Sequence, residues 1–241
     1  MLKNKRIVVT GGASGIGAAI VARCVAAGAK AVHVIDIDGD KLAASVAQYS
    51  DATLIYHQAL DVQDREALTD WLISADESTQ GFDIVFNNAG VMSGGDQLLS
   101  TPVEHLLRVI DINLIATMIG TRIAAECMAK RGIKGVIINT ASTAAFNAMP
   151  ADPAYAASKA AVVNFTQSCM PLAEQYGIRV HAVCPGVTDT AIVPRNAEWL
   201  KPALAAVQWL TPDEIVDVME EVLVDSNAPA YRRVDNAPRS V

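Results

Sequence analysis

The sequence predicts an α/β fold of the Rossmann type, a doubly wound and mostly parallel sheet with helices on both faces. Three observations predict it. Short β-branched segments alternate with longer Ala-rich segments along the chain. Hydrophobic residues make up 51% of the sequence but aromatic residues only 5%, which is typical of parallel strands covered by helices. A glycine-rich turn follows the first expected strand.

The expected elements alternate in order, which gives parallel strands joined by right-handed helical crossovers. The expected strands are 6–10, 31–36, 53–60, 82–90, 135–142 and 179–186. The expected helices are 16–27, 41–49, one that begins near Asp64, 102–130, 153–176 and one that begins at Thr211. The whole chain of 241 residues is interpreted as one catalytic domain. The irregular segment 187–210 is interpreted as a substrate lid.

Composition and charge exclude several classes of protein. The net charge of −7 and the scattered Lys and Arg residues argue against nucleic-acid binding. No apolar leader and no clean apolar span of 18 residues is visible, so we expect a cytoplasmic protein outside the membrane. The four cysteines are far apart in apolar surroundings, which predicts buried free thiols and no metal site; they are Cys24, Cys127, Cys169 and Cys184.

The turn after the first strand carries Gly11, Gly12, Gly15 and Gly17. Glycines permit a tight turn and a close approach of the backbone to a pyrophosphate at the N-terminus of the next helix. An ordinary glycine turn with close helix packing is the alternative. Its position directly after the first strand favours nucleotide binding.

Asp36 ends the second expected strand, 19 residues beyond Gly17. A dinucleotide-binding fold places an acidic residue there, on the hydroxyl groups of the adenosine ribose. A carboxylate at this position also repels a 2′-phosphate. The sequence therefore predicts NAD rather than NADP, although a simple turn residue is the alternative.

Polar residues also end the third and fourth strands. Asp61 and Val62 follow one strand, and Asn87–Asn88–Ala89–Gly90 follow the other, at the edge where adenine and ribose would lie. A helix cap at Asp61 and a plain turn at the Asn pair remain open.

Tyr155 and Lys159 are four residues apart on an expected helix, so their side chains share one face. A neighbouring ammonium and an oxidised nicotinamide would both favour the phenolate of Tyr155, which could then accept the proton of an alcohol. Ser142 lies 13 residues before Tyr155 and could hold the substrate oxygen. Aromatic packing, a solvated Lys and a loop Ser are the alternatives if each is taken singly.

Together these motifs resemble the short-chain dehydrogenase/reductase family. TGGASGIG, NNAG, Asn113, Ser142, YAASK and PGVTDT occur in the order and spacing of that family over nearly the whole chain. The CPGVTDTAI stretch is weakly similar to the hydroxyprostaglandin-dehydrogenase-like branch.

The resemblance implies an NAD-dependent oxidoreductase with defined residue roles. Tyr155 would be the general acid/base, Ser142 would orient the substrate oxygen, and Lys159 would hold the nicotinamide ribose and lower the pKa of Tyr155. Asn113 would support a water-linked proton path to Lys159; a helix-bending polar residue is the alternative. The segment 185–190 would contact the nicotinamide carboxamide, with a strand-ending turn as the alternative. The full expected set of cofactor contacts is Gly11, Ser14, Gly15, Ile16, Gly17, Asp36, Ile37, Asp61, Val62, Asn88, Ala89, Gly90, Tyr155, Lys159, Pro185, Gly186, Val187, Thr188 and Thr190.

The expected substrate is a small-molecule secondary alcohol or ketone, hydrophobic because apolar residues populate the lid and the edge of the site. These residues are Met92, Phe146, Met149, Ile192, Val193, Trp199, Leu204 and Trp209, and core packing is their alternative explanation. The resemblance implies a homodimer through helices 102–130 and 153–176, or a homotetramer. The C-terminal sequence AYRRVDNAPRSV departs from the Gly-rich tail of many members. An NAD-using epimerase or dehydratase, or an NAD-sensing protein without turnover, remain alternative functions.

Overall fold

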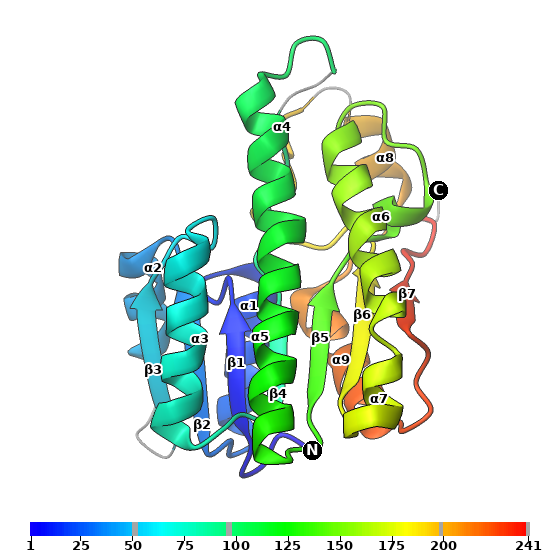
Figure 1. The fold of residues 1–241 in the computed structure, drawn as a ribbon. Helices are drawn as coiled ribbons and strands as arrows, with labels where there is room; N and C mark the ends of the chain where they lie inside the picture. Colours follow the sequence, from blue (N-terminus) through cyan, green and yellow to red (C-terminus); the bar gives the residue numbers. More distant parts are fainter. Residues whose placement is uncertain (50–52, 95–97, 198–199, 240–241) are drawn as a thin grey trace.

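One seven-stranded sheet organises the protein. The computed structural model describes residues 1–49, 53–94, 98–197 and 200–239. The strand order is β3-β2-β1-β4-β5-β6-β7, and all registered neighbours run parallel (Figure 1). The strands are β1 Arg6–Thr10, β2 Ala31–Asp36, β3 Leu54–Ala59, β4 Ile84–Asn87, β5 Val136–Thr140, β6 Arg179–Pro185 and β7 Tyr231–Val234. The predicted doubly wound α/β class is confirmed, and the sheet is wholly parallel in the described residues.

Helices cover both faces of the sheet. Figure 1 shows α3, α5 and α6 in front of the sheet and α1 and α9 behind it. The helices are α1 Gly15–Ala26, α2 Gly39–Val46, α3 Arg65–Thr79, α4 Val103–Ile110, α5 Ala116–Arg131, α6 Pro153–Ser168, α7 Pro171–Tyr176, α8 Lys201–Ala206 and α9 Pro212–Val224. A π-helical turn, Asp111–Ile115, joins α4 to α5, and a short 3-10 turn, Thr143–Phe146, follows β5.

The alternation of side chains along β1 explains how the two layers form. Ile7 and Val9 belong to the core cluster that includes α1 and α9, whereas Val8 belongs to the cluster that includes α3 and α5. All three side chains are fully buried. Because successive residues of a strand point to opposite faces, one apolar strand serves both layers.

Two expected helices are interrupted. The segment 102–130 contains a π turn, in which one extra residue per turn shifts the register of the helix. The segment 153–176 divides into α6 and α7 just before Pro171, because proline has no N–H to continue the backbone hydrogen bonds of the preceding helix. The N-terminal signals are confirmed, since Asp64 caps α3 and Thr211 caps α9 with a capping box.

The strand β7 was not predicted from the sequence. Its sequence, YRRV, has two exposed arginines and no alternating apolar pattern, because β7 lies at the edge of the sheet. The strand nevertheless pairs with β6 over four residues. Its position brings the segment after it next to the end of β6.

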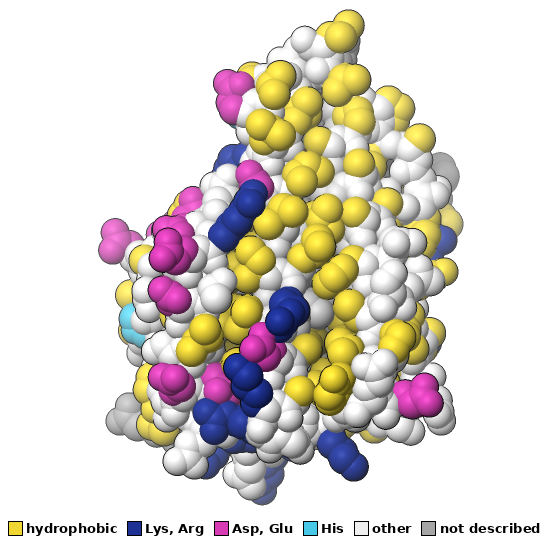
Figure 2. All heavy atoms as spheres, viewed as in Figure 1, with side chains coloured by type: hydrophobic (Ala, Val, Ile, Leu, Met, Phe, Trp, Pro, Cys, Tyr) yellow, Lys and Arg dark blue, Asp and Glu magenta, His cyan; other side chains and the backbone are white. Residues whose placement is uncertain are grey.

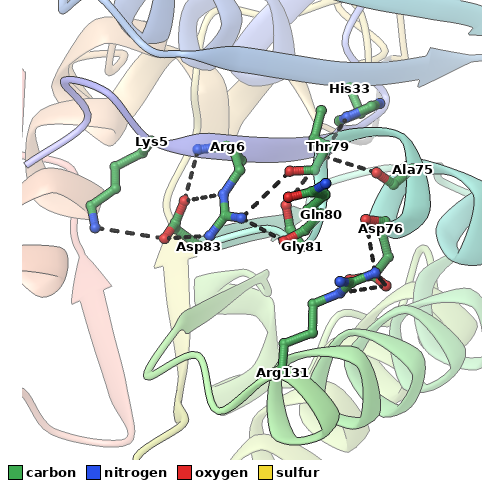
Figure 3. Close-up of polar contacts among 10 residues, drawn as sticks. All are labelled: Lys5, Arg6, His33, Ala75, Asp76, Thr79, Gln80, Gly81, Asp83 and Arg131. Carbon is green, nitrogen blue, oxygen red and sulfur yellow. Dashed lines mark hydrogen bonds and ion pairs between the residues drawn. The ribbon is translucent and has the colours of Figure 1, made fainter.

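Ion pairs stabilise the structure at the amino-terminal ends of the strands, away from the glycine turn. Arg6 on β1 contacts Asp83 just before β4 at 2.9 Å and donates to the Gln80 carbonyl at the end of α3 (Figure 3). Arg131 on α5 holds Asp76 on α3 at 2.8 Å. These contacts fix the helices in front of the sheet at the edge opposite the site.

Candidate active site

A cavity of about 500 Å³ opens at the carboxyl ends of the strands. Its wall runs from the glycine turn to the segment 187–210. Nearly all the residues predicted from the sequence line it: Gly11, Ser14, Gly15, Ile16, Asp36, Ile37, Asp61, Val62, Asn88, Ala89, Gly90, Ser142, Tyr155, Lys159, Pro185, Gly186, Val187, Thr188 and Thr190. The fold therefore brings together residues from six strands, as a doubly wound sheet should. Gly17 and Asn113 lie outside this lining.

The glycine turn leaves no room for side chains. Gly11 and Gly15 have φ values of 70° and 53°, which favour glycine. A Cβ at Gly17 would lie 1.9 Å from the Gly11 carbonyl oxygen, so Gly17 acts by close packing beneath the cavity. No side chain caps the N-terminus of α1. Its first N–H groups and the helix dipole can therefore face an anion in the cavity.

Asp36 connects the glycine turn to the end of β2. One carboxylate oxygen accepts from Ala13 N–H at 2.9 Å and the other from Asp38 N–H at 3.1 Å. These bonds orient the carboxylate at the cavity wall. Asp61 is similarly oriented by Gln63 N–H at 2.9 Å, while the neighbouring Asp64 caps α3. A helix cap is therefore not the role of Asp61.

The two asparagines at the end of β4 have different surroundings. Asn88 lines the cavity, and its amide donates to the carbonyl of Thr10 at 3.2 Å. Asn87 is buried and donates to Asn139 on β5 at 2.9 Å. A Cβ at Gly120 would lie 2.2 Å from the Asn87 side chain. The absence of a side chain at Gly120 therefore allows α5 to pack closely against Asn87. Asn87 thus supports the site from beneath.

Asn113 lies in the π turn between α4 and α5 and is fully buried. Its side chain accepts from Val91 N–H at 2.8 Å, donates to Val91 O at 2.9 Å, and donates to Ser158 Oγ at 3.0 Å. Gly90 lies between Asn113 and Lys159. A Cβ at Gly90 would be 3.4 Å from Asn113 Oδ1 and 3.3 Å from Lys159 Nζ. The π turn therefore aims Asn113 at the segment beside Lys159. The water-linked path stays a prediction.

Ser142, Tyr155 and Lys159 form one group at the cavity wall. Lys159 Nζ donates to the Thr140 carbonyl at 2.8 Å and lies 5.7 Å from the centre of the Tyr155 ring. The Ser142 hydroxyl, at the end of β5, accepts from Ala144 N–H at 3.1 Å. The i, i+4 spacing on α6 puts Tyr155 and Lys159 on the same face, and β5 supplies Ser142 opposite them.

Burial dominates the electrostatics of this group. It raises the pKa of Tyr155, a hydrogen bond with Ser142 opposes this increase, and the charge of Asp152 adds to it. Burial lowers the pKa of Lys159 to about 8. The lowering of the Tyr155 pKa by Lys159 stays a prediction. An oxidised nicotinamide in the cavity would add a positive charge that favours the phenolate.

The turn after β6 presents hydroxyl and backbone groups to the cavity. The Thr188 hydroxyl donates to Gly186 O at 3.1 Å, and the Thr190 hydroxyl to Thr188 O at 3.4 Å. A Cβ at Gly15 would lie 2.9 Å from Thr190 Cγ2. This turn therefore meets the glycine turn across the cavity.

The apolar residues expected near the substrate divide into two groups. Five of them line the cavity: Met92, Met149, Ile192, Val193 and Leu204. Phe146 and Trp209 do not, which corrects the expectation for these two. Phe146 packs 5.1 Å from the Tyr231 ring, and the Trp209 indole donates to Leu204 O at 3.0 Å. Trp199 lies outside the described residues.

Sequence reasoning missed two residues near the site. Asp152 is buried and caps α6, accepting from Tyr155 N–H at 3.0 Å and from Ser93 N–H at 2.8 Å. The Asp152–Pro153 pair is a helix-start signal that could have revealed it. Arg108 on α4 also lines the cavity. Its place on a largely exposed helix gives no comparable signal.

The fold and the site define a class of protein, an α/β dinucleotide-binding enzyme with a Ser–Tyr–Lys group beside its glycine turn. Comparison with known proteins agrees. The family described as short chain dehydrogenase matches residues 5–201. The 3beta-hydroxysteroid dehydrogenase 2 of Eggerthella lenta is 37% identical over 195 residues, which cover 80% of this chain and 74% of the relative.

Solved structures show the same likeness. The crystal structure of levodione reductase aligns with a TM-score of 0.88 and 27% identity, covering 97% of this chain and 96% of that one. A 4-hydroxyisoleucine dehydrogenase complexed with NADH has a TM-score of 0.82 and 26% identity, covering 96% and 97%. A short chain dehydrogenase from Burkholderia cenocepacia in complex with NADP has a TM-score of 0.87 and 27% identity, covering 97% of each.

The chain belongs to the short-chain dehydrogenase/reductase family. It is an oxidoreductase that interconverts a secondary alcohol and its ketone with a nicotinamide cofactor.

Proposed function

We propose that the cofactor is NAD and that Tyr155, with Ser142 and Lys159, carries the proton transfer. The single observation that supports this most strongly is that all three side chains line the same cavity as the glycine turn and Asp36. One ligand of dinucleotide length could therefore reach both groups of residues.

Each residue of the group has a distinct task. The phenolate of Tyr155 accepts the proton of the carbinol, and the Ser142 hydroxyl donates a hydrogen bond to the same oxygen. Lys159, held by the Thr140 carbonyl at 2.8 Å, presents its remaining N–H groups to the nicotinamide ribose. A bound nicotinamide supplies the hydride acceptor. Asn113 holds the Val91 backbone and the Ser158 hydroxyl beside Lys159.

The preference for NAD rests on Asp36. Its carboxylate is fixed by two backbone N–H groups at the end of β2. Such an orientation suits acceptance of hydrogen bonds from ribose hydroxyls and disfavours a nearby 2′-phosphate through charge repulsion. Replacing Asp36 by Ala should weaken the selectivity for NAD over NADP. Unchanged selectivity would contradict this placement of the ribose.

The substrate is proposed to be hydrophobic. Methionine and aliphatic side chains from four segments line the same cavity as Tyr155; they are Met92, Met149, Ile192, Val193 and Leu204. A polar polyol would leave its hydroxyl groups without partners against such a wall. A small sugar that proves the best substrate in a panel would refute the proposal.

One experiment tests the core of the proposal. Purified protein is mixed with NAD and a panel of secondary alcohols, and the absorbance of the reduced nicotinamide is followed. Tyr155→Phe should abolish turnover while NAD binding is retained. Binding of NAD without turnover across the panel would favour a sensor. Isomerised products without net reduction of NAD would favour an epimerase.

A homodimer in the cytoplasm completes the proposal. Figure 2 shows apolar side chains gathered over the face formed by α4, α5 and α6. Among the apolar residues of these helices, Val103 and Leu107 on α4 and Met118 on α5 are exposed. Burial against a second copy would remove these side chains from water. No helix among the described residues is long and apolar enough to cross a membrane. Light scattering that shows only monomer would refute the dimer.

A further inference from the structure

The segment after β7 folds back onto the turn that follows β6. Asn236 is the point of contact, and its side chain makes three hydrogen bonds. Its Oδ1 accepts from Val187 N–H at 2.7 Å, and its Nδ2 donates to Val187 O and to Gln208 O, both at 2.8 Å. The side-chain amide of Asn236 thus joins the 185–190 turn to Gln208, near the end of the segment 187–210.

The structure makes room for this contact. A Cβ at Gly186 would lie 2.1 Å from Asn236 Oδ1, so only glycine at this position allows the approach. The neighbouring backbone continues the connection, because Gln208 N–H donates to Ala237 O at 2.9 Å and Val207 forms an isolated antiparallel bridge with Pro238. The segment after β7 is therefore hydrogen-bonded to residues 207 and 208, which follow α8. Leu204 on α8 lines the cavity.

The contact also determines which backbone groups can meet a cofactor. Val187 O accepts a second hydrogen bond from Leu210 N–H at 2.9 Å, so both polar backbone groups of Val187 are engaged. Thr188 and Leu210 form an isolated parallel bridge. Its two hydrogen bonds run from Leu210 N–H to Val187 O and from Asp189 N–H, at 2.8 Å, to Leu210 O. In such a bridge the N–H of the central residue points away from the partner strand. Within the described part of the chain, Thr188 N–H has no protein acceptor.

We propose that Asn236 is a positioning residue for the nicotinamide end of the cofactor. It fixes the Val187 peptide, and this orientation presents the Thr188 backbone to the nicotinamide carboxamide and holds the lid beside it. The inference rests on the proposed function, because it requires a nicotinamide at the 185–190 turn. It narrows the carboxamide contact to the backbone of Thr188 and gives the divergent C-terminal segment a role in the site.

The test compares two ligands that differ only by the nicotinamide. Isothermal titration calorimetry measures the affinities of wild type and Asn236→Ala for NAD and for ADP-ribose. The ratio of the NAD affinity to the ADP-ribose affinity should fall about tenfold in the variant, because only the nicotinamide contact is disturbed. Asn227→Ala changes an exposed asparagine before β7 and should leave the ratio unchanged.

An unchanged ratio in Asn236→Ala overturns the proposal, whether both affinities fall together or neither changes, because a purely structural role would affect both ligands equally. If wild type binds neither ligand, the proposed function itself fails. Thermal melting establishes that the variants are folded. Should Asn236→Ala not fold, Asn236→Asp serves instead. It retains the acceptor for Val187 N–H but sets a carboxylate oxygen against Val187 O and Gln208 O. An unchanged ratio of the NAD affinity to the ADP-ribose affinity in this variant likewise overturns the proposal.

Discussion

The buried carboxylate of Asp152 should stabilise the protein more than an ordinary helix cap does. Replacement by Ala removes the N-cap of α6, which costs about 1 kcal/mol. It also removes the hydrogen bond from Ser93 N–H to a charged acceptor, which contributes about 1.5–3 kcal/mol. Relief of the desolvation of the carboxylate offsets part of this loss. We expect a net loss of about 2–3 kcal/mol in the free energy of unfolding.

Thermal and urea unfolding of Asp152→Ala measure this loss. For a chain of this size the melting temperature should fall by about 4–12 °C. Asp64→Ala is the matched control, because Asp64 caps α3 in the same way, through one backbone N–H at 3.0 Å, but is exposed. The control should lose about 0.5–1 kcal/mol. If Asp152→Ala loses no more stability than Asp64→Ala, the reasoning about the buried second hydrogen bond is refuted.

Three further predictions follow from the site and its supports. Asp152→Asn removes a negative charge that raises the pKa of Tyr155, so the increase of kcat with pH in alcohol oxidation should move to lower pH; an unchanged pH profile would contradict this. Burial alone would raise the pKa of Asp83, but hydrogen bonds from Arg6 outweigh burial and lower it. Asp83 therefore stabilises the protein above its usual pKa of about 4 and loses this effect as the pH falls through the lowered pKa. Urea unfolding of Asp83→Asn should show lower stability at pH 7 and a smaller loss on acidification, and parallel stability curves for variant and wild type would disprove it. Gly17→Ala forces a Cβ to within 1.9 Å of a backbone oxygen, so we expect a loss of about 1–3 kcal/mol and weaker NAD binding; wild-type melting and affinity would argue against that packing.

The residues that line the cavity were largely predictable because their signals are local. The glycine turn, Asp36 at the end of β2, and Tyr155 with Lys159 one helical turn apart are each readable from a few adjacent positions. The parallel topology then places the ends of the strands along one edge. Periodicity alone therefore predicted that these distant segments would meet.

Other features depended on contacts between distant segments. The edge strand β7 has no apolar pattern and forms because β6 offers a free edge. Phe146 and Trp209 have the composition of a substrate wall, yet packing against Tyr231 and the Leu204 carbonyl takes them out of it. Composition does not specify which way an apolar side chain points in an irregular segment.

The sequence by itself determined the order of the elements, the doubly wound sheet and the chemical groups at its carboxyl edge, because helix and strand periods and glycine conformations are properties of short segments. Only the tertiary structure decided the raised pKa of Tyr155, the burial of Asp152 and the hydrogen bonds of Asn236 to Val187 and Gln208. Desolvation and hydrogen-bond geometry depend on which remote groups surround an atom, and this becomes defined when the chain is packed.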